Sequence, residues 1–197
     1  MAEVTFDHPC NQTMLWSKTD ELVHQYTAKD EDKKDCFTLE DTLLGYILND
    51  QRWCGKEGSK ETFTAGCPGL DDCANGAVRS FWDRASAAFA EYACRAVTVM
   101  LNGSEEKPFY PNSTFARVEI KRLKYPKVTK LDVILVTGNN NVSNCATDNL
   151  KIDLQNALGS KIGYSCTEVS ESRVTECSSS SSSTNVGCGA CLLKSSE

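Results

Sequence analysis

Apolar residues recur at helical spacing along one stretch in the first half of the chain. The stretch covers residues 78–93, and its stripe consists of Val78, Phe81, Trp82, Ala85, Phe89 and Tyr92. Spacings of three and four residues are typical of a helix that buries one face. Apolar positions predict two further helices, over residues 14–26 and 40–48, so the first half of the chain is expected to be mainly helical.

The pattern changes after Cys94 to short runs rich in β-forming residues. These runs cover residues 96–103, 116–123, 131–138 and 161–168, with a helical segment over residues 148–158 before the last run. Strands that alternate with helices favour a small parallel sheet. We therefore predict a disulfide-rich α/β (α+β, two-lobed) fold, with an N-terminal helical lobe and a small, mainly parallel four-stranded sheet with flanking helices.

This pattern also predicts the domain organisation. Residues 1–94 are expected to form the helical lobe and residues 95–175 the α/β lobe, with the cleft of one catalytic unit between them. Residues 176–197 contain a run of serines and three cysteines, which is typical of a flexible tail.

Composition indicates an exported protein. The chain of 197 residues has 11 cysteines, only two histidines and a formal net charge of −6. Such cysteine content suits an oxidising compartment, and the acidic balance argues against nucleic-acid binding. The sequence shows no signal peptide and no apolar run long enough to span a bilayer, so we expect an extracellular ectodomain whose membrane anchor, if it has one, lies outside this chain. Four glycosylation sequons point to the same route: Asn11, Asn102, Asn112 and Asn141.

Two glutamates are candidates for chemistry, although each has an ordinary alternative. Glu40 lies in FTLEDTLLGY, where Thr38 followed three residues later by Asp41 is typical of a helix start. Glu119 lies in NSTFARVE, in a run that alternates apolar and polar residues as a strand does. Taken alone, the two side chains read as a helix-start residue and a solvated strand residue.

Five motifs in one order change that interpretation. They are CNQTMLWS, FTLEDTLLGY, WCG, SFW and NSTFARVE. In this order and spacing the chain resembles the ADP-ribosyl cyclase/cyclic ADP-ribose hydrolase family of NAD glycohydrolases, over roughly residues 10–188. Relatives usually carry several dozen further residues before the LWS motif, so the front of this chain is expected to be trimmed or compact.

The resemblance implies that Glu119 is the catalytic carboxylate beside the nicotinamide ribose. Cleavage of the N-glycosidic bond of NAD leaves an oxocarbenium-like sugar, whose charge a fixed carboxylate stabilises. Glu40 is implied as the second catalytic carboxylate, which recognises the nicotinamide carboxamide. Asn49 is aligned where vertebrate surface enzymes carry an aspartate, and it can still pair with a carboxamide.

The resemblance implies a further set of substrate-binding residues. Trp16 and Trp82 would stack on substrate rings, although the alternative for Trp82 is a core residue of the helical stripe. Lys18 would act as a cation on phosphate. The complete implied set is Trp16, Ser17, Lys18, Leu39, Asn49, Trp82, Ser86, Thr114 and Phe115.

The family disulfide pattern, carried over, implies four bridges. These are Cys10–Cys94, Cys54–Cys67, Cys145–Cys166 and Cys177–Cys188. Cys73 would pair in relatives with a cysteine outside this chain, so a Cys36–Cys73 bridge is a hypothesis, and it leaves Cys191 competing for Cys188.

The expected activity has NAD or NADP as substrate, with no cofactor and no metal, because the cysteines lack paired CxxC spacing. A small nucleotide is the expected partner, and the sequence leaves the oligomeric state open. ADP-ribose is expected as the main product and cyclic ADP-ribose as the minor one, because Thr114 stands where strongly cyclising relatives carry a bulky aromatic residue. Two alternatives are a cell-surface interaction module with weak or no turnover and a secreted inhibitor.

Overall fold

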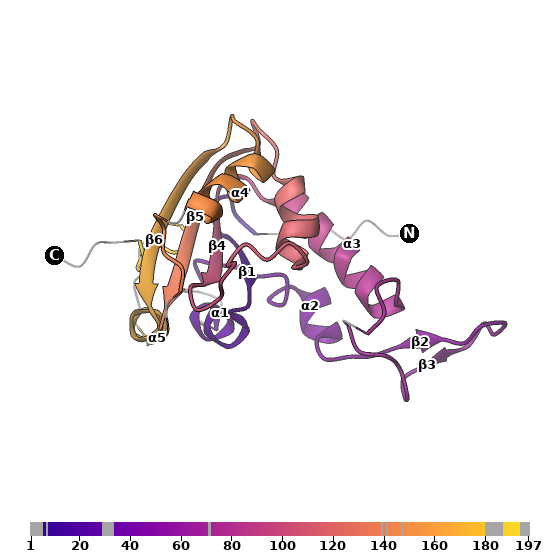
Figure 1. The fold of residues 1–197 in the computed structure, drawn as a ribbon. Coiled ribbons are helices and arrows are strands. Elements are labelled where there is room, and N and C mark those ends of the chain that lie inside the picture. The colour runs from indigo at the N-terminus through magenta and orange to yellow at the C-terminus, as the bar shows by residue number, and fades with distance from the viewer. Residues whose placement is uncertain are drawn as a thin grey trace.

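A four-stranded sheet forms the centre of the computed structural model, which describes residues 6, 8–28, 34–70, 72–138, 140, 142–146, 148–179 and 187–193. All neighbouring strands are parallel, in the spatial order β1-β4-β5-β6 (Figure 1). This confirms the predicted α/β class with a four-stranded parallel sheet. The strands are β1 (Thr13–Ser17), β4 (Arg95–Asn102), β5 (Val128–Thr137) and β6 (Gly163–Ser170).

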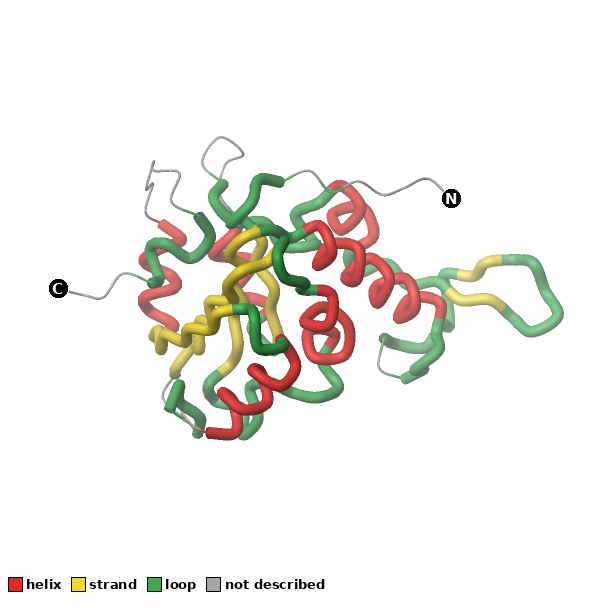
Figure 2. The backbone as a smooth tube through the Cα atoms, turned by 90° about the horizontal axis from the view of Figure 1, so that it is seen from above, coloured by secondary structure: helices red, strands yellow, loops and turns green. Residues whose placement is uncertain are grey.

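Helices cover both faces of this sheet, so the strands lie between two groups of helices (Figure 2). Successive residues of β5 point to opposite sides: Leu131, Val133 and Leu135 join one core, whereas Ile134 and Val136 join the other. Burial on both faces is typical of a parallel sheet. The first core includes α3 (Ala77–Tyr92), α4 (Asp148–Leu158) and the short η2 (Phe115–Glu119) and η3 (Ile120–Arg122), and the second includes α1 (Asp20–Thr27) and α5 (Glu171–Ser179).

The predicted helix over residues 14–26 is wrong in its first part, because residues Thr13–Ser17 form the edge strand β1. Met14 and Leu15 are both buried but in different cores, as a strand requires. The helix begins only at Asp20. The division into residues 1–94 and 95–175 stays a prediction, but the sheet takes one strand, β1, from the first part and three strands from the second.

The predicted strand over residues 116–123 is also wrong. The segment is helical: a π-helical turn, η2, followed by the 3-10 turn η3. The buried positions are 115, 116, 119, 120 and 123, which is helical spacing with two adjacent residues on the same face. Residues 118–121 alternate between apolar and charged side chains, and this alternation led to the prediction of a strand.

A capped helix and a short hairpin follow α1 in the chain. The predicted helix over residues 40–48 begins later, as α2 (Leu43–Leu48), because Thr42 caps it by accepting a hydrogen bond from Gly45 N at 3.1 Å. The two-stranded hairpin of β2 (Cys54–Gly55) and β3 (Thr62–Phe63) projects away from the main sheet (Figure 1).

Three of the implied disulfides are present: Cys10–Cys94, Cys54–Cys67 and Cys145–Cys166. The implied Cys177–Cys188 bridge is wrong, because the structure has Cys36–Cys188 and Cys177–Cys191 instead. The hypothesis of a Cys36–Cys73 bridge is wrong for the same reason, and Cys73 is a free thiol among the described residues.

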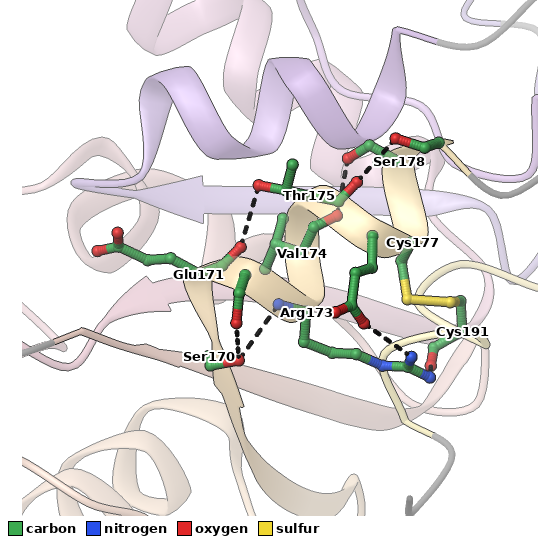
Figure 3. Close-up of polar contacts among 11 residues, drawn as sticks. Ser170, Glu171, Arg173, Val174, Thr175, Cys177, Ser178 and Cys191 are labelled. Atoms are coloured by element: carbon green, nitrogen blue, oxygen red, sulfur yellow. Dashed lines mark hydrogen bonds and ion pairs between the residues drawn. A yellow bond between two sulfur atoms is a disulfide. The ribbon is translucent and has the colours of Figure 1, made fainter.

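The backbone around residues 187–193 explains the exchange of partners. Cys188 N donates to the Asn11 carbonyl at 2.7 Å, and its own carbonyl accepts from Thr98 Oγ1 at 3.2 Å, which places Cys188 beside the sheet and Cys36. Cys191 lies next to α5, and Figure 3 shows its disulfide to Cys177. Arg173 Nη2 donates to the Cys191 carbonyl at 3.3 Å. The predicted tail therefore includes the end of α5 and this bridged turn; residues 180–186 and 194–197 of that prediction, and the Asn141 sequon, lie outside the described residues.

Candidate active site

A cleft of about 840 Å³ opens at the end of β1. Its walls are the carboxyl end of β1, the loop before α2, one face of α3, and the turn that leads into η2. Ligand sites in parallel sheets commonly lie beyond the carboxyl ends of the strands. Ten of the eleven implied catalytic and substrate-binding residues line it: Trp16, Ser17, Lys18, Leu39, Glu40, Asn49, Trp82, Ser86, Thr114 and Glu119.

Phe115 is the exception. Its side chain is fully buried and packs edge-to-face on Phe109, with ring centroids 5.6 Å apart. It belongs to the hydrophobic core and is absent from the residues that line the cleft. As the first residue of η2, Phe115 anchors the turn that carries Glu119.

Glu119 is held by a π-helical turn. The turn closes with Ile120 N donating to the Phe115 carbonyl, and Ser113 Oγ accepts a hydrogen bond from Ala116 N at 3.1 Å just before it. Single π-turns are uncommon and occur often at functional sites. Glu119 is only 7% exposed, so a carboxyl group lies nearly dry at the base of the cleft.

Three influences set the proton affinity of this carboxyl group. Burial, followed by the negative charge of Glu40, raises the pKa of Glu119 from 4.5 to about 8, and a hydrogen bond with Ser86 lowers it. Ser86 comes from α3, Glu40 from the loop before α2, and Glu119 from η2. The structure thus brings together two carboxylates that are 79 positions apart in the sequence.

Glu40 is held by one hydrogen bond of its own and by the contacts of its neighbour Asp41. Trp16 Nε1 donates to Glu40 Oε2 at 3.3 Å, which links β1 to the loop. The neighbouring Asp41 accepts from Thr38 N at 2.8 Å and from Lys34 Nζ at 2.6 Å. Of the predicted pairing between Thr38 and Asp41, the hydrogen bond from Thr38 N to Asp41 is present. It stabilises the turn that precedes α2.

Gly45 allows α2 to approach this turn. A Cβ added at Gly45 would lie 2.1 Å from the Leu39 carbonyl oxygen and 2.5 Å from Glu40 Cα. Both neighbours are backbone atoms, so neither can rotate away as the end of a side chain would. Glycine is therefore required here for close approach, and it sets the position of Glu40 indirectly.

Trp82 lies in a row of aromatic rings along α3. Its ring contacts Phe81 edge-to-face at 5.3 Å between centroids, and Phe81 contacts Trp53 in the same way at 5.4 Å. Trp82 is half-buried and lines the cleft, so the helical stripe and the cleft wall share this residue. Trp16 faces the same cleft from β1.

One ion pair in the cleft wall was not predicted from the sequence. Arg117 donates to both oxygens of Asp83, at 3.0 and 2.7 Å, and joins η2 to α3. Asp83 directly follows Trp82, and Arg117 lies two residues before Glu119 in the same motif. This closeness to two candidate site residues is the one feature of the sequence that could have indicated the ion pair. Other lining residues that the sequence did not identify as candidates for the site include Arg79, Arg52 and Tyr110.

The comparisons with known proteins agree with this arrangement. The family model described as ADP-ribosyl cyclase matches residues 1–186. The chain belongs to the ADP-ribosyl cyclase family. It is 50% identical over 129 residues to ADP-ribosyl cyclase/cyclic ADP-ribose hydrolase 1 of Rattus norvegicus, which covers 65% of this chain and 42% of the relative. It is 36% identical over 165 residues to the Aplysia kurodai ADP-ribosyl cyclase/cyclic ADP-ribose hydrolase, covering 81% and 57%.

Solved structures of this family share the fold. Porcine CD38 in complex with a covalent intermediate superimposes with a TM-score of 0.69 at 40% identity, covering 82% of this chain and 70% of that one. Aplysia cyclase in complex with the substrate NGD and the product cGDPR gives a TM-score of 0.70 at 33% identity, covering 81% and 63%. The chain spans about half the length of the two curated relatives from Rattus norvegicus and Aplysia kurodai.

The described residues offer neither a metal cluster nor a membrane-spanning helix. No group of three or more histidine, cysteine, aspartate or glutamate side chains is placed to hold a metal ion among them. Within the same residues, no helix combines the length and apolar character needed to cross a membrane.

Proposed function

We propose that this member of the ADP-ribosyl cyclase family cleaves the nicotinamide N-glycosidic bond of NAD or NADP. The observation that carries the proposal is the buried Glu119, held at the base of a nucleotide-sized cleft and opposed by Glu40. The relatives named above support it, since their names describe ADP-ribosyl cyclase and cyclic ADP-ribose hydrolase activity.

The chemistry needs one well-placed carboxylate. The bond between ribose C1′ and the nicotinamide nitrogen breaks with its electron pair moving to the ring, so nicotinamide leaves neutral without a proton donor. The positive charge moves to the ribose, where the Glu119 carboxylate stabilises it in a dry environment. A water oxygen then bonds to C1′ and loses a proton, which gives ADP-ribose.

The raised pKa of Glu119 fits a site built for a cationic substrate. At neutral pH the empty cleft holds Glu119 largely protonated, because its pKa is about 8. The nicotinamide ring of bound NAD is positively charged, and an opposite charge nearby favours the carboxylate. Substrate binding therefore drives ionisation of the group that the reaction uses.

The remaining residues recognise the two ends of the bond. Glu40 accepts from the nicotinamide carboxamide while Trp16 Nε1 holds its other side, and Asn49 offers its amide to the same group. Trp16 and Trp82 supply ring faces for a cationic ring. Lys18, Ser17, Ser86 and Thr114 supply the cation and the hydroxyl groups that face the phosphate and ribose portions.

The intermediate can be captured by water or by the adenine of the same molecule. Cyclisation requires the adenine to fold back and be held, so the cleft wall controls the partition. Thr114 leaves that wall small, and we propose ADP-ribose as the major product and cyclic ADP-ribose as the minor one. The five disulfides favour an extracellular location, and the partner is a small-molecule nucleotide.

Product analysis tests both parts of the proposal. The oxidised protein is incubated with NAD, and nicotinamide, ADP-ribose and cyclic ADP-ribose are separated by chromatography at early times. We expect nicotinamide and ADP-ribose in nearly equal amounts, and a larger cyclic fraction from Thr114→Phe. Nicotinamide release no faster than without protein, from both NAD and NADP, would overturn the assignment. Cyclic ADP-ribose as the main early product would overturn the partition.

A further inference from the structure

Asp83 and Arg117 form a two-bond contact in the wall of the cleft. Arg117 Nη1 and Nη2 donate to the two oxygens of Asp83, and Nε donates to the Asn112 carbonyl at 3.1 Å. Each side chain of the ion pair is 28% exposed, and both line the cleft. All three guanidinium nitrogens thus donate within the protein, which fixes the orientation of the Arg117 side chain.

The pair joins the two elements that carry the reaction. Asp83 lies on α3, directly after Trp82 and three residues before Ser86. Arg117 lies on η2, two residues before Glu119. Ser86 on α3 also lowers the pKa of Glu119 on η2, so the environment of the carboxyl group depends on how these two elements lie relative to each other.

The π-turn needs such links. A π-turn is rarer than an α-turn and persists where the surrounding structure holds it. In η2 the π-turn is followed immediately by a 3-10 turn, so two hydrogen-bond patterns meet within residues 115–122. A bidentate arginine–carboxylate contact fixes orientation as well as distance.

A second ion pair, between α3 and the adjoining η3, provides an internal comparison. Arg122 on η3 donates to Glu91 on α3 at 2.8 Å, but through one nitrogen, with the two side chains 48% and 55% exposed. Exposed single-bond pairs of this kind contribute little. Neither Arg122 nor Glu91 lines the cleft.

We propose that Asp83 and Arg117 are a positioning pair, which fixes Trp82 and Ser86 on α3 relative to Glu119 on η2. The inference rests on the proposed function for its kinetic consequence. Neither residue touches the reacting atoms; the pair acts by keeping the carboxylate within reach of the ribose.

The test is a double-mutant cycle of Asp83→Asn, Arg117→Gln and the double variant, with Glu91→Gln and Arg122→Gln as the matched control pair. We expect each single variant and the double variant to lower kcat for NAD by a similar factor of about ten, because displacements of about 1 Å at a reacting centre can cost 10²-fold. Restoring an ion pair with Asp83→Glu and Arg117→Lys together should recover part of kcat. The control pair should keep kcat within twofold.

Asp83→Asn is the decisive variant. If Arg117 acted as a phosphate ligand, freeing it from Asp83 would leave kcat unchanged and lower KM, and that result would overturn the positioning role. Equal loss of melting temperature in both pairs without a fall in kcat would also overturn it.

Hydrogen exchange separates this inference from the proposed function. The amides of Arg117 and Ile120 bond to the carbonyls of Ser113 and Phe115, and we expect both to exchange faster in Asp83→Asn but not in Glu91→Gln. If wild-type protein releases no nicotinamide, the function fails while this measurement still decides the coupling. Unchanged exchange in Asp83→Asn would overturn the inference even in a fully active protein.

Discussion

The two groups of helices on either side of the sheet differ in the features that stabilise or destabilise them. The stapled side consists of α1, α5 and residues 187–193, where two disulfides hold the last described turn to α5 and to the segment before Glu40. The cleft side consists of α3, η2 and the loop before α2, where a buried carboxyl group lies opposite a second one. Burying an ionisable group costs stability, and cross-links raise it. The stapled side therefore gains stability from its cross-links, whereas the cleft side carries the cost of a buried carboxyl group.

The largest expected effect on the cleft side comes from Glu119→Gln. The change keeps the volume but removes the charge that faces the oxocarbenium-like ribose, so nicotinamide release should fall by about 10²–10³-fold. The measurement is single-turnover release from NAD. Glu176→Gln on α5, where the side chain is 67% exposed, is the control and should retain wild-type rates.

The same variant has a pH-dependent effect on stability. The folded pKa of Glu119 is raised above its ordinary value, so ionisation destabilises the fold progressively between about pH 4.5 and 8. Glu119→Gln removes this cost. The free energy of unfolding of the variant, relative to wild type, should therefore rise as pH increases through this range, and a difference independent of pH would contradict the burial argument.

The stapled side should behave in the opposite way. Replacing Cys177 and Cys191 by alanine opens a loop of sequence separation 14 and should cost about 3 kcal/mol of unfolding free energy. kcat and KM should not change at temperatures where the variant is folded, because neither cysteine lines the cleft. A tenfold fall in kcat in folded protein would show that the two sides are coupled.

The hairpin disulfide sharpens that contrast. Cys54–Cys67 has nearly the same separation, 13, but it lies beside Arg52 and Pro68, which line the cleft. Replacing both of these cysteines by alanine should raise KM for NAD, because the disulfide would no longer hold Arg52 and Pro68 in place at the cleft. If the Cys54/Cys67 and Cys177/Cys191 double variants had equal KM values for NAD, the hairpin disulfide would have no particular role at the cleft.

Much of the fold was predictable because its signals are local. The stripe from Val78 to Tyr92 and the continuous apolar run of β5 each determine an element, and both elements are present as predicted. The predicted helix at residues 148–158 has the observed bounds. β1 and η2 could not be predicted in the same way, because pairing with β4 and packing against α3 override short-range pattern.

The candidate site was predictable through the ordered motifs, and its supporting contacts were not. The motifs identified Glu40, Trp16 and Trp82, all of which line one cleft. They could not show that Phe115 points into the core or that Arg117 pairs with Asp83, since both depend on the direction of a π-turn. The disulfide exchange at Cys188 depends equally on a backbone path that spacing does not reveal.

Gly45→Ala should have an intermediate effect on the cleft side. The added methyl group would collide with the backbone of Leu39 and Glu40, and overpacking of this kind typically costs about 1–3 kcal/mol. The displaced Glu40 should also slow nicotinamide release. Gly55→Ala is the control, since nothing lies within 4 Å of its added Cβ. Wild-type stability and rate in Gly45→Ala would show that the turn before α2 can move without consequence.

The smallest expected effects are two opposite shifts in pH dependence. If the carboxylate of Glu119 is the active form, kcat/KM should rise with pH along a limb near pH 8, which reports the free protein. Glu40→Gln removes a negative charge that raises the pKa of Glu119, so the limb should move to lower pH. Ser86→Ala removes a hydrogen bond that lowers the same pKa, so the limb should move to higher pH. Both variants keep the burial that is the largest cause, which is why the shifts are small compared with the effects above. Ser80→Ala, on the exposed side of α3, should leave the limb in place. Shifts in the same direction for Glu40→Gln and Ser86→Ala would show that the limb belongs to another group, and that the buried carboxyl does not set the pH dependence of the cleft.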